Sequence, residues 1–290
     1  DDEVITTPNS FIASTAVIVH LGAKPIFVDV LSDQNMDPSK IEKAITKKTK
    51  VIMPVHLSGR VCQMDKILHI AKKYNLKVVE DAAQSIGSKF NNKMSGSFGD
   101  IGCFSAHPLK NLGALGDSGY MTTNNFKFFK MAKSLSNHGM ENRNIIKNFG
   151  YVSRMDNIQA AILNLKLKKL KSVISKRRKN VKVYEKNLDL KNIQISYEKN
   201  KEFNTYHTFV VQVNKRNKLK SYLEKKGIKT SIHYPRPIHL QPATKKYGYK
   251  KGDFINAEKQ SNRILSLPVN ENISPKKVKY ICKIINSFYN

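Results

Sequence analysis

The chain has 290 residues, which is enough for one large domain and a smaller one. Hydrophobic residues make up 40% of it and charged residues 25%, and no apolar run approaches the roughly 18 residues of a membrane span, so the composition predicts a soluble globular protein. The net charge of +29 could indicate a nucleic-acid partner, but the lysines are spread over predicted helix faces without interleaved aromatic residues. We therefore expect neither a nucleic-acid nor a membrane partner.

The three cysteines, Cys62, Cys103 and Cys282, lie far apart and form no CxxC pair. An odd, widely spaced set is typical neither of a disulfide framework nor of a zinc site. The first residues also lack the basic and apolar segments of a secretion signal. We therefore expect no metal site and a location in the reducing cytoplasm.

Short apolar runs alternate with helical patterns over the first half of the chain. Strands are predicted at 3–6, 25–30, 51–55, 76–80, 101–104 and 119–123, and helices at 41–44 and 64–74. Such alternation is typical of right-handed βαβ crossovers, which build a mainly parallel sheet flanked by helices. The sequence therefore predicts an α/β large domain over residues 1–165.

The pattern changes from Asp156 onward. One long helix is predicted from Asp156 through the basic stretch 166–182, with Asp156 or Ser153 placed to cap its start. It is followed by a strand at 208–213, a helix at 218–226, a Pro-rich loop at 233–242 and a helix from Pro275. We interpret residues 166–290 as a smaller α+β C-terminal domain.

Asp81 and Lys110 are the first candidates for chemistry. Asp81 stands at the carboxyl end of a predicted buried strand, where open α/β sheets place ligand-binding groups; a helix-capping aspartate is the alternative. Lys110 lies in a turn whose small and apolar neighbours would desolvate its amine and lower its pKa; a surface lysine is the alternative. A lysine that forms a Schiff base with pyridoxal phosphate (PLP) needs this environment, and the same chemistry needs a carboxylate on the pyridine nitrogen.

Further motifs stand in a fixed order around these two residues. They lie at 22–30, 54–59, 153–156, 159–161 and 265–268. Together with the Asp81 and Lys110 segments, they make the chain resemble the DegT/DnrJ/EryC1/StrS sugar aminotransferases over nearly its whole length. The resemblance implies the type I fold of PLP-dependent aminotransferases, PLP as the cofactor, and a homodimer with shared active sites.

The same resemblance implies roles for single residues. Lys110 would be the catalytic residue, which forms the Schiff base and moves the Cα proton, and Asp81 would hold the pyridinium. Gln84 would lie near the ring hydroxyl and Ser105 on the phosphate. Phe11 would stack on the ring face; without the family we would interpret Phe11 as core packing and Ser105 as a turn residue.

Segments 110–117, 233–235 and 239–243 are similar to enzymes that aminate C-3 of nucleotide-linked 3-keto-6-deoxyhexoses, although C-4 aminotransferases share much of this pattern. His233 and His239 are therefore candidate substrate-binding residues, with a structural role as the alternative. We expect L-glutamate as the donor, and a product used in cell-surface polysaccharide or other glycoside biosynthesis.

The chain departs from the family pattern at two places. Relatives have, upstream of the position of Asp1, a Gly-Thr-Ala type turn whose amides bind the cofactor phosphate. We expect these residues to be part of a longer protein, with weakened phosphate binding as the alternative. Many relatives also have Asn at the position of Val152, where it reaches the phosphate of the neighbouring subunit's cofactor, and Val cannot donate that hydrogen bond.

Two alternative functions stay open. A PLP sugar dehydratase of the same fold carries His at the position of Lys110, so Lys110 favours transamination. A truncated, non-catalytic binding protein would stay colourless with added PLP, whereas a bound cofactor colours the protein.

Overall fold

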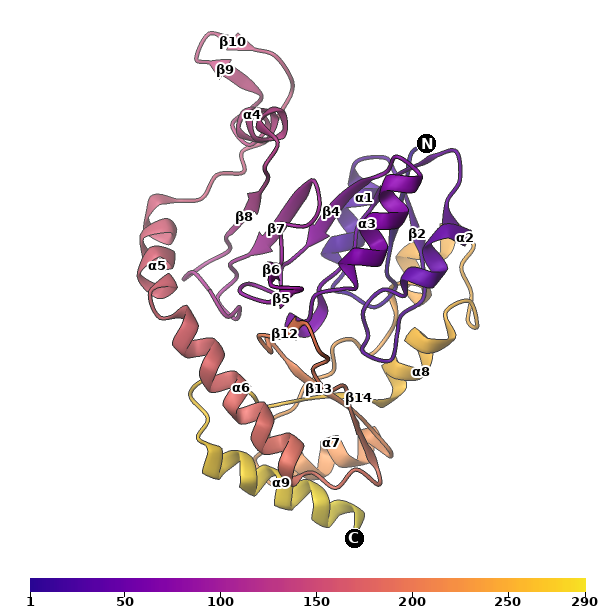
Figure 1. Ribbon diagram of the computed structural model, residues 1–290, viewed down its shortest axis with the longest axis vertical. Helices are drawn as coiled ribbons and strands as arrows, with labels where there is room; N and C mark the ends of the chain where they lie inside the picture. Colours follow the sequence, from indigo (N-terminus) through magenta and orange to yellow (C-terminus); the bar gives the residue numbers. More distant parts are fainter.

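A computed structural model describes all 290 residues and shows two lobes, with the chain ends far apart (Figure 1). The first lobe is built on a six-stranded sheet and the second on a three-stranded sheet. Helices α5 (Asn157–Leu167) and α6 (Leu170–Asn187) run along one side of the molecule, from the first lobe to the second. Of all the helices, none combines the length and the apolar character that crossing a membrane requires.

The central sheet of the first lobe is almost entirely parallel. Its strands are β1 (Glu3–Thr6), β2 (Lys24–Phe27), β3 (Thr49–Ile52), β4 (Lys77–Asp81), β7 (Ile101–Ser105) and β8 (Gly119–Thr122). The order is β2-β1-β3-β4-β7-β8, and only β7 and β8 pair antiparallel, which confirms the predicted sheet. Because β1 lies between β2 and β3, the winding reverses there, and open sheets bind ligands at the carboxyl ends of strands beside such a point.

Three helices accompany this sheet. They are α1 (Ala13–His20), α2 (Ile41–Ala44) and α3 (Met64–Lys73). Helix α3 forms because its apolar residues recur at helical spacing, and Ile67 and Ile70 turn one face toward the sheet. There they join Ile5, Ile52 and Val78 in a buried core.

The second lobe packs three helices around an antiparallel sheet. The strands are β11 (Ile193–Ile195), β13 (Phe209–Val213) and β14 (Ile264–Leu267), and the helices are α6, α7 (Arg216–Lys225) and α9 (Pro275–Tyr289). Tyr184 of α6 is completely buried, stacks on Phe209 at 5.1 Å between ring centroids, and donates its hydroxyl to the carbonyl of Pro268 at 2.8 Å. This core holds α6 against the second sheet.

The single long helix predicted from Asp156 is wrong, because the chain forms α5 and α6 as separate helices. Asp156 occupies the position before α5, but its side chain makes no capping hydrogen bond. At the break, the N–H of Lys169 donates to the carbonyl of Lys166, a tightened i to i+3 turn. The break redirects the chain: Leu163 packs with the first lobe, whereas Tyr184 packs in the second.

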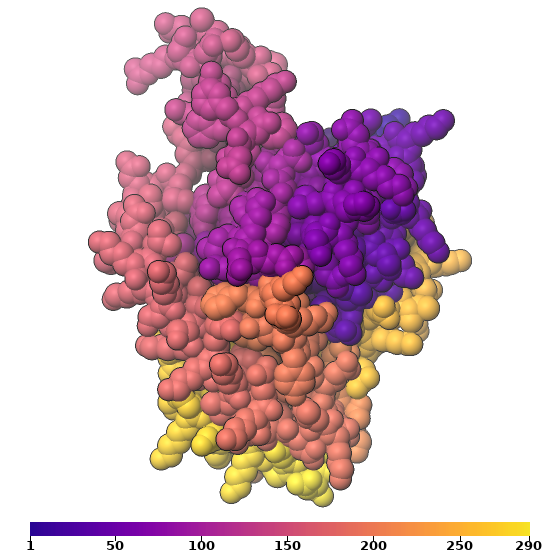
Figure 2. Space-filling view, in the orientation of Figure 1, coloured from indigo at the N-terminus to yellow at the C-terminus, as the bar shows by residue number.

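Residues 124–156 form an arm that stands away from both lobes (Figures 1 and 2). It contains α4 (Phe126–Leu135), β9 (Met140–Asn142) and β10 (Ile145–Ile146). Helix α4 has no buried residue, although apolar side chains line it. Large exposed apolar residues of the arm are Phe126, Phe129, Met131, Ile145, Ile146, Phe149, Tyr151 and Val152.

Part of the C-terminal half returns to the first lobe. Helix α8 (Ile255–Arg263) begins where the N–H groups of Asn256 and Ala257 donate to the carboxylate of Asp29 at 2.9 and 3.0 Å. A small sheet also joins the halves, since β12 (Glu202–Phe203) pairs with β5 (Lys89–Phe90), which in turn pairs with β6 (Lys93–Met94). The second half therefore packs on the first at more than one place.

Candidate active site

The candidate residues lie at the carboxyl edge of the central sheet. Asp81 is the last residue of β4 and Ser105 the last of β7, while Phe11 follows β1 and Lys110 follows β7 within a few residues. Because the carboxyl ends of neighbouring parallel strands meet at one edge, these positions are brought together by the sheet itself.

Asp81 is held by two donors. The hydroxyl of Ser14 donates to Asp81 Oδ2 at 2.6 Å, and the N–H of Ala83 donates to Oδ1 at 3.1 Å. Ser14 lies in the first turn of α1, whose N-terminal end carries a partial positive charge that stabilises a nearby carboxylate. No cationic side chain pairs with Asp81, so this fixed carboxylate has no charged partner within the chain.

Lys110 has a half-buried side chain in the turn after β7. Burial lowers the pKa of the Lys110 ammonium, and the negative charge of Asp81 opposes part of that effect. The backbone N–H of Lys110 donates to the carbonyl of His107 at 2.8 Å, which fixes the turn. The amine is therefore neutral, and nucleophilic, more readily than that of an exposed lysine.

Gln84 connects three parts of the site. Its Oε1 accepts from the N–H of Ser58 at 2.8 Å, and its Nε2 donates to the hydroxyl of Tyr234 at 3.4 Å. The Tyr234 ring lies 6.1 Å from the ring of Phe11, centroid to centroid. Phe11 is 57% exposed, so it is not part of a packed core and presents an aromatic face at the edge of the site.

Two histidines stand near Lys110. Burial lowers the pKa of His207 to about 3, and the positive charges of Lys110 and Arg177 add to this effect. Burial, and then the charge of Lys110, also lowers the pKa of His233, whose Nδ1 lies 2.8 Å from Ser266 Oγ. Both imidazoles are therefore neutral at pH 7.

Ser105 and His239 have different surroundings. Ser105 Oγ accepts from the N–H of His107 at 3.3 Å, at the start of the turn that carries Lys110. His239 is buried, with Nε2 3.0 Å from Glu258 Oε1 and its ring edge against Phe254 at 4.7 Å. The structure thus gathers Phe11, Asp81, Gln84, Lys110 and His233 but not His239. This placement favours the structural alternative for His239.

Four residues of this neighbourhood carried no role in the sequence prediction: Ser14, Ser58, His207 and Tyr234. Tyr234 stands in a motif that marks the family, but its spacing alone gives no function. Ser14 lies one helical turn after Ser10, a spacing that many helices show. No local pattern identifies these residues, because each reaches the site through the tertiary fold.

A buried pair supports β4 from the face opposite Asp81. Glu80 accepts from His56 Nε2 at 2.8 Å and from three backbone N–H groups of the 96–99 loop at 2.6 to 2.7 Å. The Nδ1 of His56 accepts from the N–H of Cys62, so Nε2 carries the proton and the imidazole is neutral. Burial alone would raise the pKa of Glu80, but the hydrogen bonds from His56 and the backbone outweigh it and lower the pKa.

Replacing Glu80 by Gln is expected to lower the free energy of unfolding at pH 7 by about 1 to 3 kcal/mol, because one buried charge-assisted network is weakened. The folded pKa of Glu80 lies below its ordinary value of 4.5. Its contribution is thus fully present above pH 4.5 and is lost as the pH falls through the folded pKa. Urea unfolding at pH 7, 5, 4 and 3 measures this, and the variant should lose less stability on acidification.

Glu224, exposed on α7, provides the matched control. Glu224→Gln should leave the acid dependence unchanged. An equal slope of stability against pH in Glu80→Gln and the unmodified chain would contradict the assignment.

Comparison with known proteins shows to which protein family the chain belongs. A sequence model of the DegT/DnrJ/EryC1/StrS aminotransferase family matches residues 1–286. The chain belongs to this family. It is 39% identical to the pleiotropic regulatory protein of Geobacillus stearothermophilus, over 99% of this chain and 78% of that protein. It is also 39% identical to dTDP-3-amino-3,6-dideoxy-α-D-galactopyranose transaminase of Aneurinibacillus thermoaerophilus, over 99% of this chain and 79% of that protein.

The fold agrees with this membership. DesV of S. venezuelae, solved in complex with a ketimine intermediate, superimposes with a TM-score of 0.96 at 32% identity, covering 99% of this chain and 78% of that one. The DegT/DnrJ/EryC1/StrS member described here thus has the type I fold of PLP-dependent aminotransferases, and PLP is the cofactor of its family. The predicted family, fold and cofactor are confirmed.

The residues at the strand ends fit PLP. A protonated pyridine nitrogen needs a carboxylate, and Asp81 is fixed there without a cationic partner. The aldehyde needs an amine with a lowered pKa, which burial gives to Lys110. Phe11 offers an exposed ring for stacking.

Proposed function

We propose that the chain transfers an amino group from L-glutamate to a keto group of a nucleotide-linked deoxysugar, with C-3 favoured over C-4. The observation that carries the proposal is that a partly desolvated Lys110 and the fixed carboxylate of Asp81 stand at the same edge of the sheet, without an ion pair between them. Support for the sugar comes from the transaminase of a dTDP-linked 3-amino-3,6-dideoxyhexose that is 39% identical to this chain. The product would enter cell-surface polysaccharide or other glycoside biosynthesis.

The chain's own residues divide into holding and reacting groups. Asp81 would hold the pyridine nitrogen, Gln84 the side of the ring hydroxyl, Ser105 the phosphate and Phe11 the ring face. PLP, when bound, supplies the electron-withdrawing ring that lets a proton leave the carbon bearing the amino group. Lys110 Nζ takes up that proton and returns it, so one lysine serves as base and then as acid.

His233 is the proposed substrate-binding histidine of the two predicted ones. Its Nδ1 is placed by Ser266 at 2.8 Å, and it stands close enough to Lys110 for that charge to lower its pKa. A neutral imidazole binds a sugar hydroxyl without adding charge beside the reacting amine. His239, in contrast, uses its Nε2 for Glu258.

The activity test uses the purified chain with PLP, L-glutamate and a panel of dTDP- and UDP-linked 3-keto- and 4-keto-hexoses. We expect 2-oxoglutarate and the amino sugar in equal amounts, measured by mass spectrometry, with the 3-keto substrates turned over fastest. Loss of the sugar hydroxyl without gain of nitrogen would indicate the dehydratase alternative. A colourless chain after PLP addition would indicate a binding protein without the cofactor.

The working state in this proposal is a homodimer in the cytoplasm. The arm supports the dimer, because α4 has no buried residue and Phe126, Phe129 and Met131 on it remain largely exposed. A second copy of the chain would cover them. Three unpaired cysteines, two of them buried, fit a reducing compartment.

Replacing Phe129, which is 51% exposed on α4, by Glu is expected to weaken self-association about 30-fold or more, since a charge would enter an apolar contact. Sedimentation equilibrium across a concentration series measures the dissociation constant. Tyr280, 50% exposed on α9, is the control, and Tyr280→Glu should leave the constant unchanged. A dimer of undiminished stability in Phe129→Glu would rule out the arm as the interface.

A further inference from the structure

Residues 196–208, here called the inter-lobe segment, lie between the two lobes. Figure 2 shows part of this segment in orange, between the indigo first lobe and the red α6. The segment contains β12 and ends at the start of β13. It meets the first lobe at residues 57–60, the loop that follows β3 and donates to Gln84.

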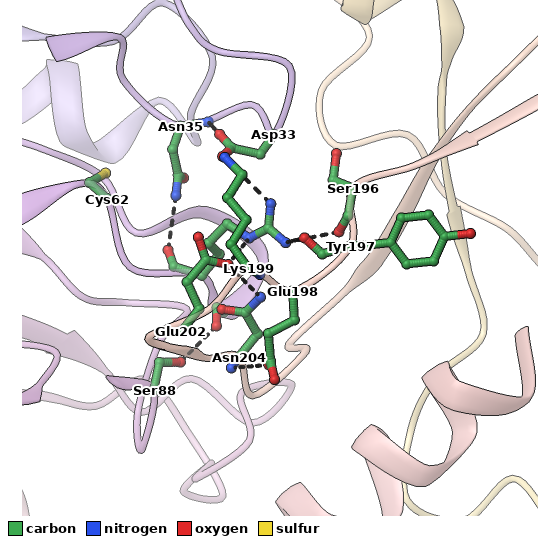
Figure 3. Close-up of polar contacts among 12 residues, drawn as sticks. Asp33, Asn35, Cys62, Ser88, Ser196, Tyr197, Glu198, Lys199, Glu202 and Asn204 are labelled. Carbon is green, nitrogen blue, oxygen red and sulfur yellow. Dashed lines mark hydrogen bonds and ion pairs between the residues drawn. The ribbon is translucent and has the colours of Figure 1, made fainter. Parts of the chain in front are cut away.

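Arg60 is the buried centre of this contact. Its Nη2 donates to the carbonyls of Ser196 at 2.8 Å and Tyr197 at 2.6 Å, and its Nε lies 3.3 Å from Glu202 Oε2. Its Nη1 lies 3.5 Å from Oδ2 of Asp33, a first-lobe carboxylate. Figure 3 shows Asp33 at the top of this cluster, Ser196 and Tyr197 to its right and Glu202 at its lower left. One planar guanidinium therefore joins groups of both lobes.

The two backbones are closest next to Arg60. Gly59 has φ +91°, and a Cβ there would lie 2.7 Å from the backbone nitrogen of Tyr206 and 2.9 Å from that of His207. Ser58 and Tyr206 also have positive φ, at 60° and 47°. Non-glycine residues keep such conformations only where their surroundings determine them.

This contact reaches the supports of both Gln84 and Lys110. Ser58 donates its N–H to Gln84 at 2.8 Å, while its Oγ lies 2.9 Å from Oγ1 of Thr208 in the inter-lobe segment. On the other side, Asn111, the neighbour of Lys110, donates its Nδ2 to the carbonyl of Thr205 at 3.1 Å. The N–H of Thr205 in turn donates to the carbonyl of the residue before Arg60 at 3.0 Å. A shift of the segment would thus move the supports of both Gln84 and Lys110.

We propose that Arg60 is a positioning residue, which fastens the inter-lobe segment to the 57–60 loop and thereby sets the placement of Gln84 and Lys110. The effect of this positioning on catalysis rests on the proposed function. Arg60 itself contacts neither Gln84 nor Lys110. Its guanidinium is suited to the task because its planar fork donates to two carbonyls and at the same time lies against two carboxylates, an arrangement that a lysine ammonium does not reproduce.

The test compares the full chain with Arg60→Met. Hydrogen exchange followed by mass spectrometry, without cofactor, should rise about tenfold or more in peptides that cover residues 58, 205 and 110. In the PLP-loaded enzyme at low temperature, kcat should fall about 10- to 100-fold while KM for the sugar changes little, because alignment rather than sugar binding is lost. Arg60→Lys should rescue neither quantity.

Arg216 provides the matched control, since it is also buried but donates to Ile264 within the second lobe. Arg216→Met should lower stability without raising exchange at residues 58 and 110. Unchanged exchange at residues 58 and 205 in Arg60→Met overturns the proposal, and so does raised exchange with an unchanged kcat. If the unmodified chain aminates no sugar, the proposed function fails, whereas the exchange at residue 110 still decides whether Arg60 orders the site.

Discussion

Replacing Lys110 by Ala is expected to abolish amination, with kcat falling by about 10⁴-fold or more, because the variant loses both the nucleophile and the proton carrier. Burial lowers the pKa of this lysine, and the negative charge of Asp81 opposes part of that effect. Borohydride reduction of the PLP-loaded chain, followed by peptide mass spectrometry, should find the cofactor covalently attached at Lys110 in the unmodified chain. In the variant that attachment should be absent.

Lys72 serves as the control for this experiment. It is exposed on α3, far along the chain from the turn that carries Lys110, and Lys72→Ala should keep full activity and covalent labelling. Sugar amination that survives in Lys110→Ala would show that another group moves the proton, and the proposed role would fall.

Replacing Asp81 by Asn is expected to lower kcat/KM for the glutamate half-reaction by about 10²- to 10³-fold, the size typical of removing one electrostatic stabiliser. The change keeps the volume and still offers an oxygen to Ser14, which donates to Asp81 at 2.6 Å, so the fold should lose only the hydrogen bond from the N–H of Ala83 at 3.1 Å. Stopped-flow absorbance of the PLP-loaded chain after glutamate addition measures the rate.

Asp65 provides the comparison, because it is exposed in the first turn of α3 and only caps a local N–H. Asp65→Asn should react at the normal rate. A rate in Asp81→Asn within twofold of normal would mean that this carboxylate does not serve the pyridine nitrogen.

The first lobe could be predicted because its elements carry local signals. Alternating strands and helices differ in hydrophobic period, and the period alone places β1, β3, β4 and β7 within a few residues. The prediction placed no element at 126–135, and α4 there contributes no buried residue to the core of either lobe. The break between α5 and α6 was missed because the stretch around Lys168 contains neither Gly nor Pro, and only packing on two different lobes bends it there.

The site could be predicted where it depends on strand ends. Asp81 follows a buried strand, and Lys110 follows the next strand of the sheet, so topology alone brings them to one edge. Ser14 and Tyr234 lie 67 and 150 residues from the side chains they bond, and such contacts have no local pattern. His239 stands in a motif of the family, which made it a candidate for substrate binding. No sequence pattern indicates that its Nε2 instead bonds to Glu258.

The return of α8 to the first lobe has a consequence for engineering. Asp29 fixes the start of α8, and Ile238, Phe254 and Ala257 share one apolar cluster with Phe27. The C-terminal half is therefore not an interchangeable module. A chimera that exchanges this half between relatives must exchange residues 25–31 along with it, because otherwise the new half will meet the end of β2 and the following residues of another sequence.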